Sequence, residues 1–190
     1  TLQLGSGSSM TAILNGRPID TSMGFSPLEG LIMATRSGDL DPALSVFLQR
    51  NEGLSLDRLE KLLNEESGLL GVSGISGDMK QLLEEENESA RLAVTLYCYR
   101  ARKYLGAFLA VLGGADAILF GGGIGEHSAQ VRENILSGMA WAGIVLDLQK
   151  NLATAGTEAC ISRKESGTEV WVVPVDEAVI LAQEAMSVAA

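Results

Sequence analysis

The sequence predicts an α/β domain whose central sheet is antiparallel in one part and parallel in another. Three strand-like segments separated by glycine turns open the chain, at residues 1–4, 8–14 and 17–23. Asn15-Gly16 lies between the second and third segments and is a strong hairpin signal, so an antiparallel meander is expected. Two later apolar strands, at residues 115–120 and 169–175, each lead into helical sequence, which is typical of parallel neighbours.

The middle of the chain, between the meander and the first apolar strand, is expected to be helical. Short helices joined by a loop are predicted over residues 26–50, because Pro27 follows Ser26 and Pro42 follows Asp41 at two typical helix starts. Leucines at helical spacing predict a further helix over residues 54–64, and a stretch rich in small residues then precedes another helix.

The longest predicted helix covers about residues 89–112. Five of its side chains are spaced by three or four positions and form one stripe: Tyr97, Ala101, Tyr104, Phe108 and Leu112. Such a stripe is more often part of a core than an aromatic ligand site, so core packing is expected. A helix over residues 129–142, ending near Gly143, and a closing helix over residues 176–190 complete the order.

Composition limits the classes of function. The chain has 190 residues, of which 46% are hydrophobic and 20% charged, so it can bury a real core. Its formal net charge of -10 argues against a surface built for nucleic acid or for an anionic membrane. Gly113, Gly114 and Asp116 interrupt the longest apolar region, so no membrane span is expected.

The cysteines and the start of the chain suggest a cytosolic protein and a fragment. Cys98 and Cys160 are far apart and form no CxxC pair, which is typical of reduced, buried cysteines. The first residues do not resemble a signal peptide. Because the chain starts in strand-like sequence without an initiator methionine, we expect it to be part of a longer protein.

The segment "FGGGIGEHSAQVREN", residues 120–134, is the most conspicuous motif. A dinucleotide fingerprint needs a third glycine, but its two possible registers place Glu126 and Ser128 there. A phosphate loop of the GxxxxGK[ST] type needs a Gly-Lys pair, and the sequence has none. Two interpretations stay open: an anion-binding turn between a strand and a helix, or only a tight turn.

Other candidate phosphate or metal contacts also have ordinary alternatives. Arg36 could clamp phosphate oxygens, or it could pair with Asp39 or Asp41. Lys80 is a further candidate phosphate partner, although a solvated surface lysine is more common. The acids at positions 176 and 177 follow a buried strand, where they could hold Mg²⁺ or simply begin a helix. The turn "LGSGSS" at residues 4–9 suits a phosphate but also an ordinary hairpin.

Five segments together resemble the acetate kinase family, that is, the acetate, propionate and butyrate kinases. The longest is "DTSMGFSPLEGLIMATRSGDLDPA" at residues 20–43. The others, in chain order, are "LGSGSS", "GVSGISGDMKQL", "GGADAILFGGGIGEHSAQVRENIL" and "VVPVDEA", starting at residues 4, 71, 113 and 172. The resemblance covers essentially the whole chain, but only the C-terminal part of the family's usual length.

The resemblance implies a ribonuclease-H-like fold, shared by sugar kinases, Hsp70 and actin. It has a mixed sheet of three antiparallel and two parallel strands, five in all, flanked by helices. The implied reaction is reversible, Mg²⁺-dependent transfer of a phosphoryl group between ATP and a short-chain carboxylate, giving an acyl phosphate and ADP. Residues 1–190 would be the nucleotide-binding C-terminal domain of a cytoplasmic protein, expected to be a homodimer.

The same resemblance assigns roles to residues. Arg36 matches the arginine that stabilises the transferring phosphoryl group, and Glu177 matches the Mg²⁺-associated glutamate. The implied nucleotide contacts form three groups: Gln3, Leu4, Gly5, Ser6 and Gly7; Asp78, Met79 and Lys80; and Gly123, Ile124, Gly125, Glu126 and His127.

Four positions depart from the family's usual residues: Gln3, Met79-Lys80, His127 and Asp176. The family's N-terminal domain, which carries a further arginine and a catalytic histidine, is also absent from this sequence. A non-catalytic nucleotide-binding or dimerisation module of the same fold is therefore the alternative function, and a dinucleotide-binding oxidoreductase is a more distant one.

Overall fold

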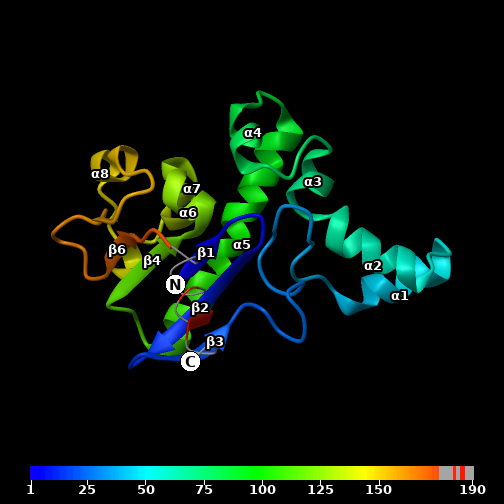
Figure 1. Ribbon diagram of the computed structural model, residues 1–190, viewed down its shortest axis with the longest axis horizontal. Helices are drawn as coiled ribbons and strands as arrows, with labels where there is room; N and C mark the ends of the chain where they lie inside the picture. Colours follow the sequence, from blue (N-terminus) through cyan, green and yellow to red (C-terminus); the bar gives the residue numbers. More distant parts are fainter. Residues whose placement is uncertain (176–181, 183–184, 187–190) are drawn as a thin grey trace.

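A six-stranded mixed sheet forms the centre of the protein, in the order β3-β2-β1-β4-β6-β5. Figure 1 labels these strands except β5. The computed structural model describes residues 1–175, 182 and 185–186. The strands are β1 (Leu2–Leu4), β2 (Ser8–Leu14), β3 (Arg17–Thr21), β4 (Ala117–Gly121), β5 (Ala159–Cys160) and β6 (Glu169–Val172). Strands β1, β2 and β3 form the expected antiparallel meander, and β1, β4 and β6 are parallel.

The sixth strand is the one departure from the expected five-stranded sheet. Strand β5 pairs antiparallel with β6 at the sheet edge and has only two residues, Ala159 and Cys160. Two residues are too few to show the alternation of apolar and polar side chains by which a strand is recognised. The expectation of five strands was wrong by this edge strand alone.

The turn between β2 and β3 has the geometry that its sequence predicts. Asn15 and Gly16 have φ angles of 51° and 74°, respectively. Positive φ at both central residues is typical of a type I′ turn, whose twist matches that of the flanking strands. Asn15 is the only non-glycine residue with positive φ in the described part of the chain.

The helices account for most of the remaining described residues. They are α1 (Pro42–Asn51), α2 (Leu56–Glu65), α3 (Gly68–Ser73), α4 (Met79–Glu84), α5 (Glu88–Leu112), α6 (Gly122–His127), α7 (Ala129–Leu136) and α8 (Leu148–Ala153), with a 3₁₀ turn, η1, at Ala140–Ala142. In the part of the chain that the structure describes, no helix combines the length and the apolar character needed to cross a bilayer.

Two helix predictions were wrong in extent. Residues 22–41 form turns and not a helix, because Gly30 and Gly38 have φ angles of 103° and 68° and interrupt any helical path. The helix expected over residues 129–142 stops at Leu136, near Gly138 with a φ of 77°. The closing helix expected over residues 176–190 falls almost entirely outside the described residues.

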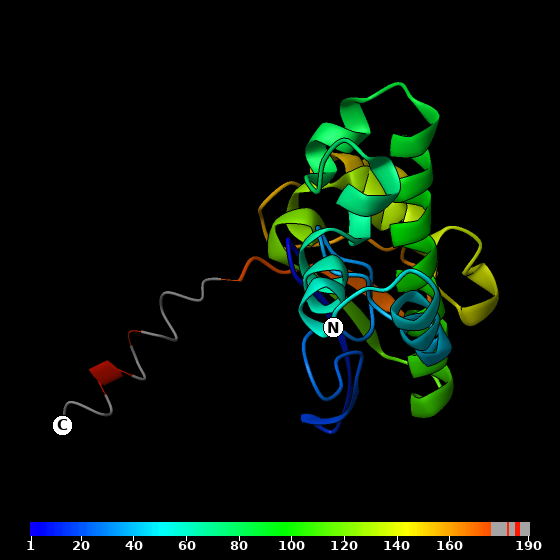
Figure 2. The ribbon, with the colours of Figure 1, turned by 90° about the vertical axis from the view of Figure 1, so that its right-hand side faces the viewer.

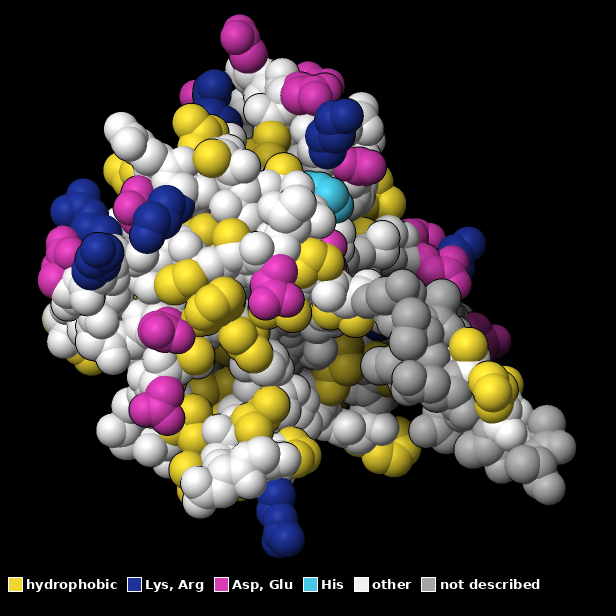
Figure 3. All heavy atoms as spheres, turned by 60° about the vertical axis from the view of Figure 1, so that its left-hand side comes forward, with side chains coloured by type: hydrophobic (Ala, Val, Ile, Leu, Met, Phe, Trp, Pro, Cys, Tyr) yellow, Lys and Arg dark blue, Asp and Glu magenta, His cyan; other side chains and the backbone are white. Residues whose placement is uncertain are grey.

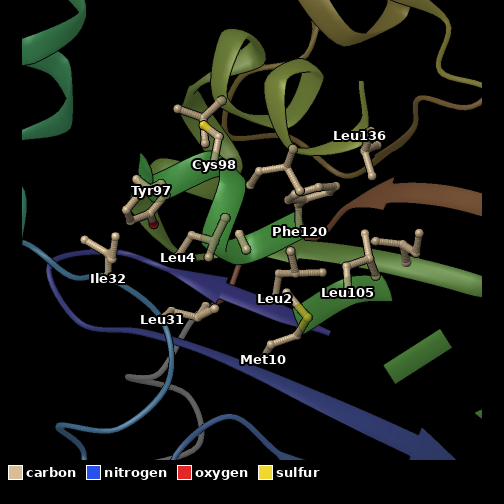
Figure 4. Packing of buried hydrophobic residues seen from close by; sticks show 14 of the residues in the cluster. Leu2, Leu4, Met10, Leu31, Ile32, Tyr97, Cys98, Leu105, Phe120 and Leu136 are labelled. Atoms are coloured by element: carbon tan, nitrogen blue, oxygen red, sulfur yellow. The ribbon is translucent and has the colours of Figure 1, made fainter. Parts of the chain in front are cut away.

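Helix α5 packs against the sheet and supplies much of the core (Figures 2 and 4). From the predicted stripe, Tyr97, Ala101 and Phe108 are buried, and Tyr104 and Leu112 pack against the same cluster. The Tyr97 hydroxyl shares a hydrogen bond of 2.9 Å with Ser8 Oγ. The interpretation of this stripe as core is therefore confirmed.

The topology brings three chain segments to one edge of the sheet. Because β1, β4 and β6 are parallel neighbours, their carboxyl ends lie side by side. The turn at residues 5–7 follows β1, helix α6 follows β4, and residues 173–175 follow β6. In sheets of this kind ligands bind outside the carboxyl ends of the strands, so this edge is where a site is expected.

We expect Phe120→Ala to lower the free energy of unfolding by about 3–5 kcal/mol, since a buried phenyl ring would be replaced by a cavity. Phe120 is 0% exposed on β4, in the middle of the core. Urea unfolding measures the change. Phe25→Ala is the matched control: the Phe25 ring is fully exposed, and its loss should change stability by no more than about 0.5 kcal/mol. Equal effects of the two variants would contradict the packing described above.

Candidate functional site

A cleft of about 730 Å³ opens at this edge of the sheet. Its lining comes from the turn after β1 (Gly5, Ser6), from the start and first turns of α4 (Gly77, Asp78, Met79, Lys80, Leu83, Glu84) and from α6 and its end (Gly123, Ile124, His127, Ser128). All three groups of expected nucleotide contacts thus contribute to one cavity. The single histidine is visible at the surface in Figure 3, with acidic and basic side chains nearby.

The turn after β1 forms one wall and is closed by its own backbone. The Gly5 N–H donates to Gly7 O at 2.9 Å, and Ser8 Oγ donates to Gly5 O at 3.3 Å. Ser6 O in turn accepts from Ala34 N–H at 3.0 Å. The turn is therefore fixed from both sides, and the Ala34 bond attaches it to the loop that carries Arg36.

Helix α4 forms a second part of the wall, and Asp78 caps its first turn. Asp78 Oδ1 accepts from the N–H groups of Lys80 and Gln81, at 2.7 and 3.2 Å. Met79 is buried in the core while Lys80 is exposed. Of this expected group, Lys80 therefore offers an exposed cation to the cleft, while Asp78 uses one carboxylate oxygen to cap the helix.

The glycine turn after β4 crosses directly over β1. Gly122 has a φ of 74°, and a Cβ at this position would lie 2.6 Å from Leu4 O, so only glycine fits. A Cβ on Gly123, in contrast, would meet nothing within 4 Å, because this residue faces the open cleft. The motif thus makes a tight turn at Gly122 and lines the cavity at Gly123.

Glu126 stabilises this turn from within. Its Oε1 accepts from Gly122 N–H at 3.0 Å and from Val175 N–H at 3.2 Å. The carboxylate thereby joins the turn after β4 to the chain that leaves β6. Glu126 does not line the cleft, and its hydrogen bonds give it a structural role.

Arg132 on α7 is the buried cation behind the glycine turn, and it is 0% exposed. Nη1 donates to Gly125 O and Glu126 O at 2.8 and 2.9 Å, and Nη2 donates to Asn151 O and Thr154 O, both at 2.8 Å. Nε donates to Asn151 Oδ1 at 2.8 Å, so all five N–H groups are satisfied. Burial lowers the Arg132 pKa to about 10, which leaves the guanidinium charged at neutral pH.

Sequence reasoning missed Arg132, although a signal was present. In "VRENIL" an arginine suggests the solvated face of a helix. Ile135 and Leu136, however, follow at positions i+3 and i+4 and are both buried, which places Arg132 on the apolar face.

His127 lies between the cleft and the segment that Arg132 anchors. Gly156 has a φ of 64°, and a Cβ there would come within 2.5 Å of His127 Cε1. Gly156 N–H also donates to Glu126 O at 3.1 Å. Residues 154–156 therefore support one side of His127, and the residue also lines the cleft.

Arg36 lies beside the turn after β1 and is free of the ion pairs that the sequence left open. Its Nη1 donates to Pro27 O at 3.2 Å and lies 3.6 Å from Met33 Sδ. A Cβ on Gly7 would be 3.7 Å from the same nitrogen. Asp39 pairs instead with Arg100, and Asp41 caps α1. Within the described residues no carboxylate pairs with the Arg36 guanidinium.

The remaining expected contacts lie around the cleft and not on its wall. Leu4 and Gly125 are buried, and Gly7 lies next to Arg36. The Gln3 side chain lies beside the end of β4, with Oε1 2.8 Å from where a Gly121 Cβ would be. Glu177 lies outside the described residues.

Comparison with known proteins accounts for this arrangement. The sequence model of the Acetokinase family matches residues 1–183. The chain belongs to this family. It is 52% identical over 188 residues to the acetate kinase of Solibacter usitatus, covering 97% of this chain and 45% of that protein.

Solved structures of the acetokinase family show the same fold. The crystal structure of Porphyromonas gingivalis acetate kinase superposes with a TM-score of 0.94 at 43% identity, over 100% of this chain and 48% of that one. The crystal structure of a propionate kinase from Francisella tularensis gives a TM-score of 0.90 at 38% identity, over 96% of this chain and 47% of that one. The chain is thus an α/β domain of the acetokinase type and spans about half the length of its relatives.

We expect Arg132→Leu to lower the free energy of unfolding by about 3 kcal/mol or more, because four backbone carbonyl oxygens and the Asn151 amide oxygen each lose a charged donor in a largely buried site. Urea unfolding measures the effect. Arg58→Leu is the matched control, since this guanidinium is 48% exposed and pairs with Glu66 at the surface; its loss should change stability by no more than about 1 kcal/mol. A similarly small effect at position 132 would show that the five hydrogen bonds are dispensable.

Proposed function

We propose that the chain is the nucleotide-binding C-terminal domain of a short-chain carboxylate kinase. In the proposed reaction a carboxylate oxygen, for example of acetate, attacks the γ-phosphorus of ATP. The bond from this phosphorus to the bridging oxygen breaks, ADP leaves, and an acyl phosphate forms, reversibly. The observation that supports this most strongly is the convergence of three chain segments on one cleft at the carboxyl edge of the sheet, in a member of the acetokinase family.

Arg36 is the residue we propose to stabilise the transferring phosphoryl group. Phosphoryl transfer depends mainly on positioning and on neutralising charge in the transition state. A guanidinium beside the glycine turn with no carboxylate partner among the described residues is available for an incoming anion. It also offsets the unfavourable field of a chain with net charge -10.

Mg²⁺ is proposed to bind together with the nucleotide. In kinases this ion is held by phosphate oxygens and only one or two protein carboxylates. That requirement agrees with the described residues, among which no group of three potential ligands converges. Glu177 is the carboxylate we propose for it, and the ion would neutralise charge on the transferring phosphoryl group.

The rest of the proposal concerns the whole protein. A further N-terminal domain would supply the remaining contacts to phosphate and carboxylate, because the chain spans about half the length of its relatives. We further propose a cytoplasmic homodimer. Two cysteines without a disulfide, Cys98 and Cys160, agree with a reducing compartment.

In the full-length enzyme, Arg36→Ala should lower kcat for acyl phosphate formation by about 10³-fold or more, by analogy with other arginines that meet a transferring phosphoryl group. The rate of acyl phosphate production at saturating ATP and acetate measures it. Arg50→Ala, at the exposed end of α1, is the control and should retain nearly full turnover. Normal kcat in the Arg36 variant would refute the assigned role.

Nucleotide binding in the cleft is tested at Gly123. We expect Gly123→Leu to weaken binding of Mg-ATP by about tenfold or more, equivalent to about 1.4 kcal/mol, since the new side chain would occupy the cleft without straining the fold. Isothermal titration calorimetry gives the affinity. Gly106→Leu is matched, because Gly106 also lies in a helix with nothing within 4 Å of its Cβ position, and its affinity should stay unchanged.

The same titrations separate the alternatives. A wild-type protein that gives no heat with Mg-ATP would favour the interaction module, and binding of NAD without ATP would favour the oxidoreductase. Equal weakening by both leucine variants would show that the cleft is not the nucleotide site.

A further inference from the structure

A second group of polar side chains, away from the cleft, joins the Arg36 loop to helix α5. Asp39 Oδ1 accepts from Gly30 N–H at 2.8 Å, while Oδ2 accepts from Tyr104 Oη at 2.8 Å and lies 3.1 Å from Arg100 Nη1. Arg100 Nη1 also lies within hydrogen-bond distance of Gly30 O and Asp39 O, at 3.3 and 3.2 Å. Both oxygens of this half-buried carboxylate therefore have partners within the protein.

These contacts close the loop of residues 30–39 at its base. Asp39 N–H donates to Gly30 O at 3.1 Å, so the two ends of the loop meet directly. Gly38, with a φ of 68°, passes so close to Leu31 O that a Cβ would lie 2.5 Å from it. Arg36 lies within the closed loop, where its carbonyl accepts from Met33 N–H at 3.2 Å.

The far side of the loop is held by backbone groups of other elements. Ala34 N–H donates to Ser6 O, while Met33 O and Ala34 O accept from Leu69 and Leu70 N–H, at 3.0, 2.9 and 2.9 Å. The loop is thus fixed to the glycine turn and to α3 on one side, and by Asp39 to α5 on the other. Since the Arg36 side chain itself has only the two weak contacts described above, its direction depends on this backbone.

We propose that Asp39, together with Arg100 and Tyr104, positions Arg36 for its reaction. This inference rests on the proposed role of Arg36 in phosphoryl transfer. Asp39 does not touch the cleft and is not a catalytic residue. Its carboxylate pairs with Arg100 and accepts hydrogen bonds from the Tyr104 hydroxyl and from Gly30 N–H. These contacts fix the two ends of the loop from which Arg36 extends.

Tyr104 is protonated at neutral pH and can therefore donate its hydrogen bond to Asp39. Burial, and next the hydrogen bond to Asp39, raises the Tyr104 pKa to about 12, so its hydroxyl stays a donor at neutral pH. The cluster therefore has one carboxylate acceptor, one guanidinium and one neutral hydroxyl donor. Replacing the carboxylate by an amide of the same size removes the charge and puts an NH₂ group either against Gly30 N–H or against Arg100 and the Tyr104 hydroxyl.

In the full-length enzyme we expect Asp39→Asn to lower kcat by about 10- to 100-fold, since small displacements of a positioned group have effects of this size. The KM for ATP should change by no more than about twofold, because the cleft wall does not include Asp39. Asp41→Asn is the matched control: Asp41 caps α1, and asparagine caps equally well, so its kcat should match the wild type.

A double-mutant cycle with Arg36→Ala distinguishes positioning from general weakening of the fold. If Asp39 acts through Arg36, adding Asp39→Asn to Arg36→Ala should leave the residual kcat unchanged. An equal loss in both backgrounds, or an unaltered kcat in Asp39→Asn alone, would overturn the proposal. Normal kcat in Arg36→Ala would instead overturn the role of Arg36 itself, and with it the positioning role.

If Asp39→Asn does not fold, Tyr104→Phe replaces it in the same cycle, since only a hydroxyl is removed. The expected loss of kcat is smaller, and it should again disappear in the Arg36→Ala background. A loss that persists in that background would count against positioning.

Discussion

The hydrogen bonds of the buried Arg132 guanidinium are the interaction on which the site depends. Four backbone carbonyls from two separate segments converge on one charge. Without this cation the turn after β4 and residues 151–154 would each bury unsatisfied acceptors, which is unfavourable. The position of His127 and of the glycine turn therefore follows from a residue that never meets solvent.

Close approach of backbone to backbone is the second constraint. Gly122 crosses β1, Gly77 passes Ala34 O, and Gly68 passes the carbonyls of Met33 and Arg36, each where a Cβ would collide. Side chains would keep these segments apart. The absence of side chains lets the arginine loop lie within hydrogen-bond distance of the turn after β1 and of the start of α3, and lets the start of α4 pass close to it.

Local patterns predicted the regular elements well and the irregular ones poorly. The Asn15-Gly16 hairpin, the parallel strands and the buried stripe of α5 depend on signals within a few residues, and all are observed. Residues 22–41 carry a local helix signal at Ser26-Pro27, yet contacts with α3, α5 and the glycine turn hold them as a loop. The sequence could not decide whether Arg36 pairs with Asp39, because Asp39 pairs instead with Arg100. Arg100 is 61 residues from Asp39 in the chain, so no local pattern predicts this pair.

The Glu126 side chain extends the hydrogen bonding between two neighbouring strands at the carboxyl edge of the sheet. The last backbone rung between β4 and the chain leaving β6 is Val173 N–H to Phe120 O, at 2.9 Å. Beyond it, the Glu126 carboxylate receives one N–H from each side and continues the ladder by a side chain. The two strand ends therefore cannot splay apart without breaking this extra rung, so the carboxyl edge of the sheet is stiffened where parallel pairing would otherwise fray.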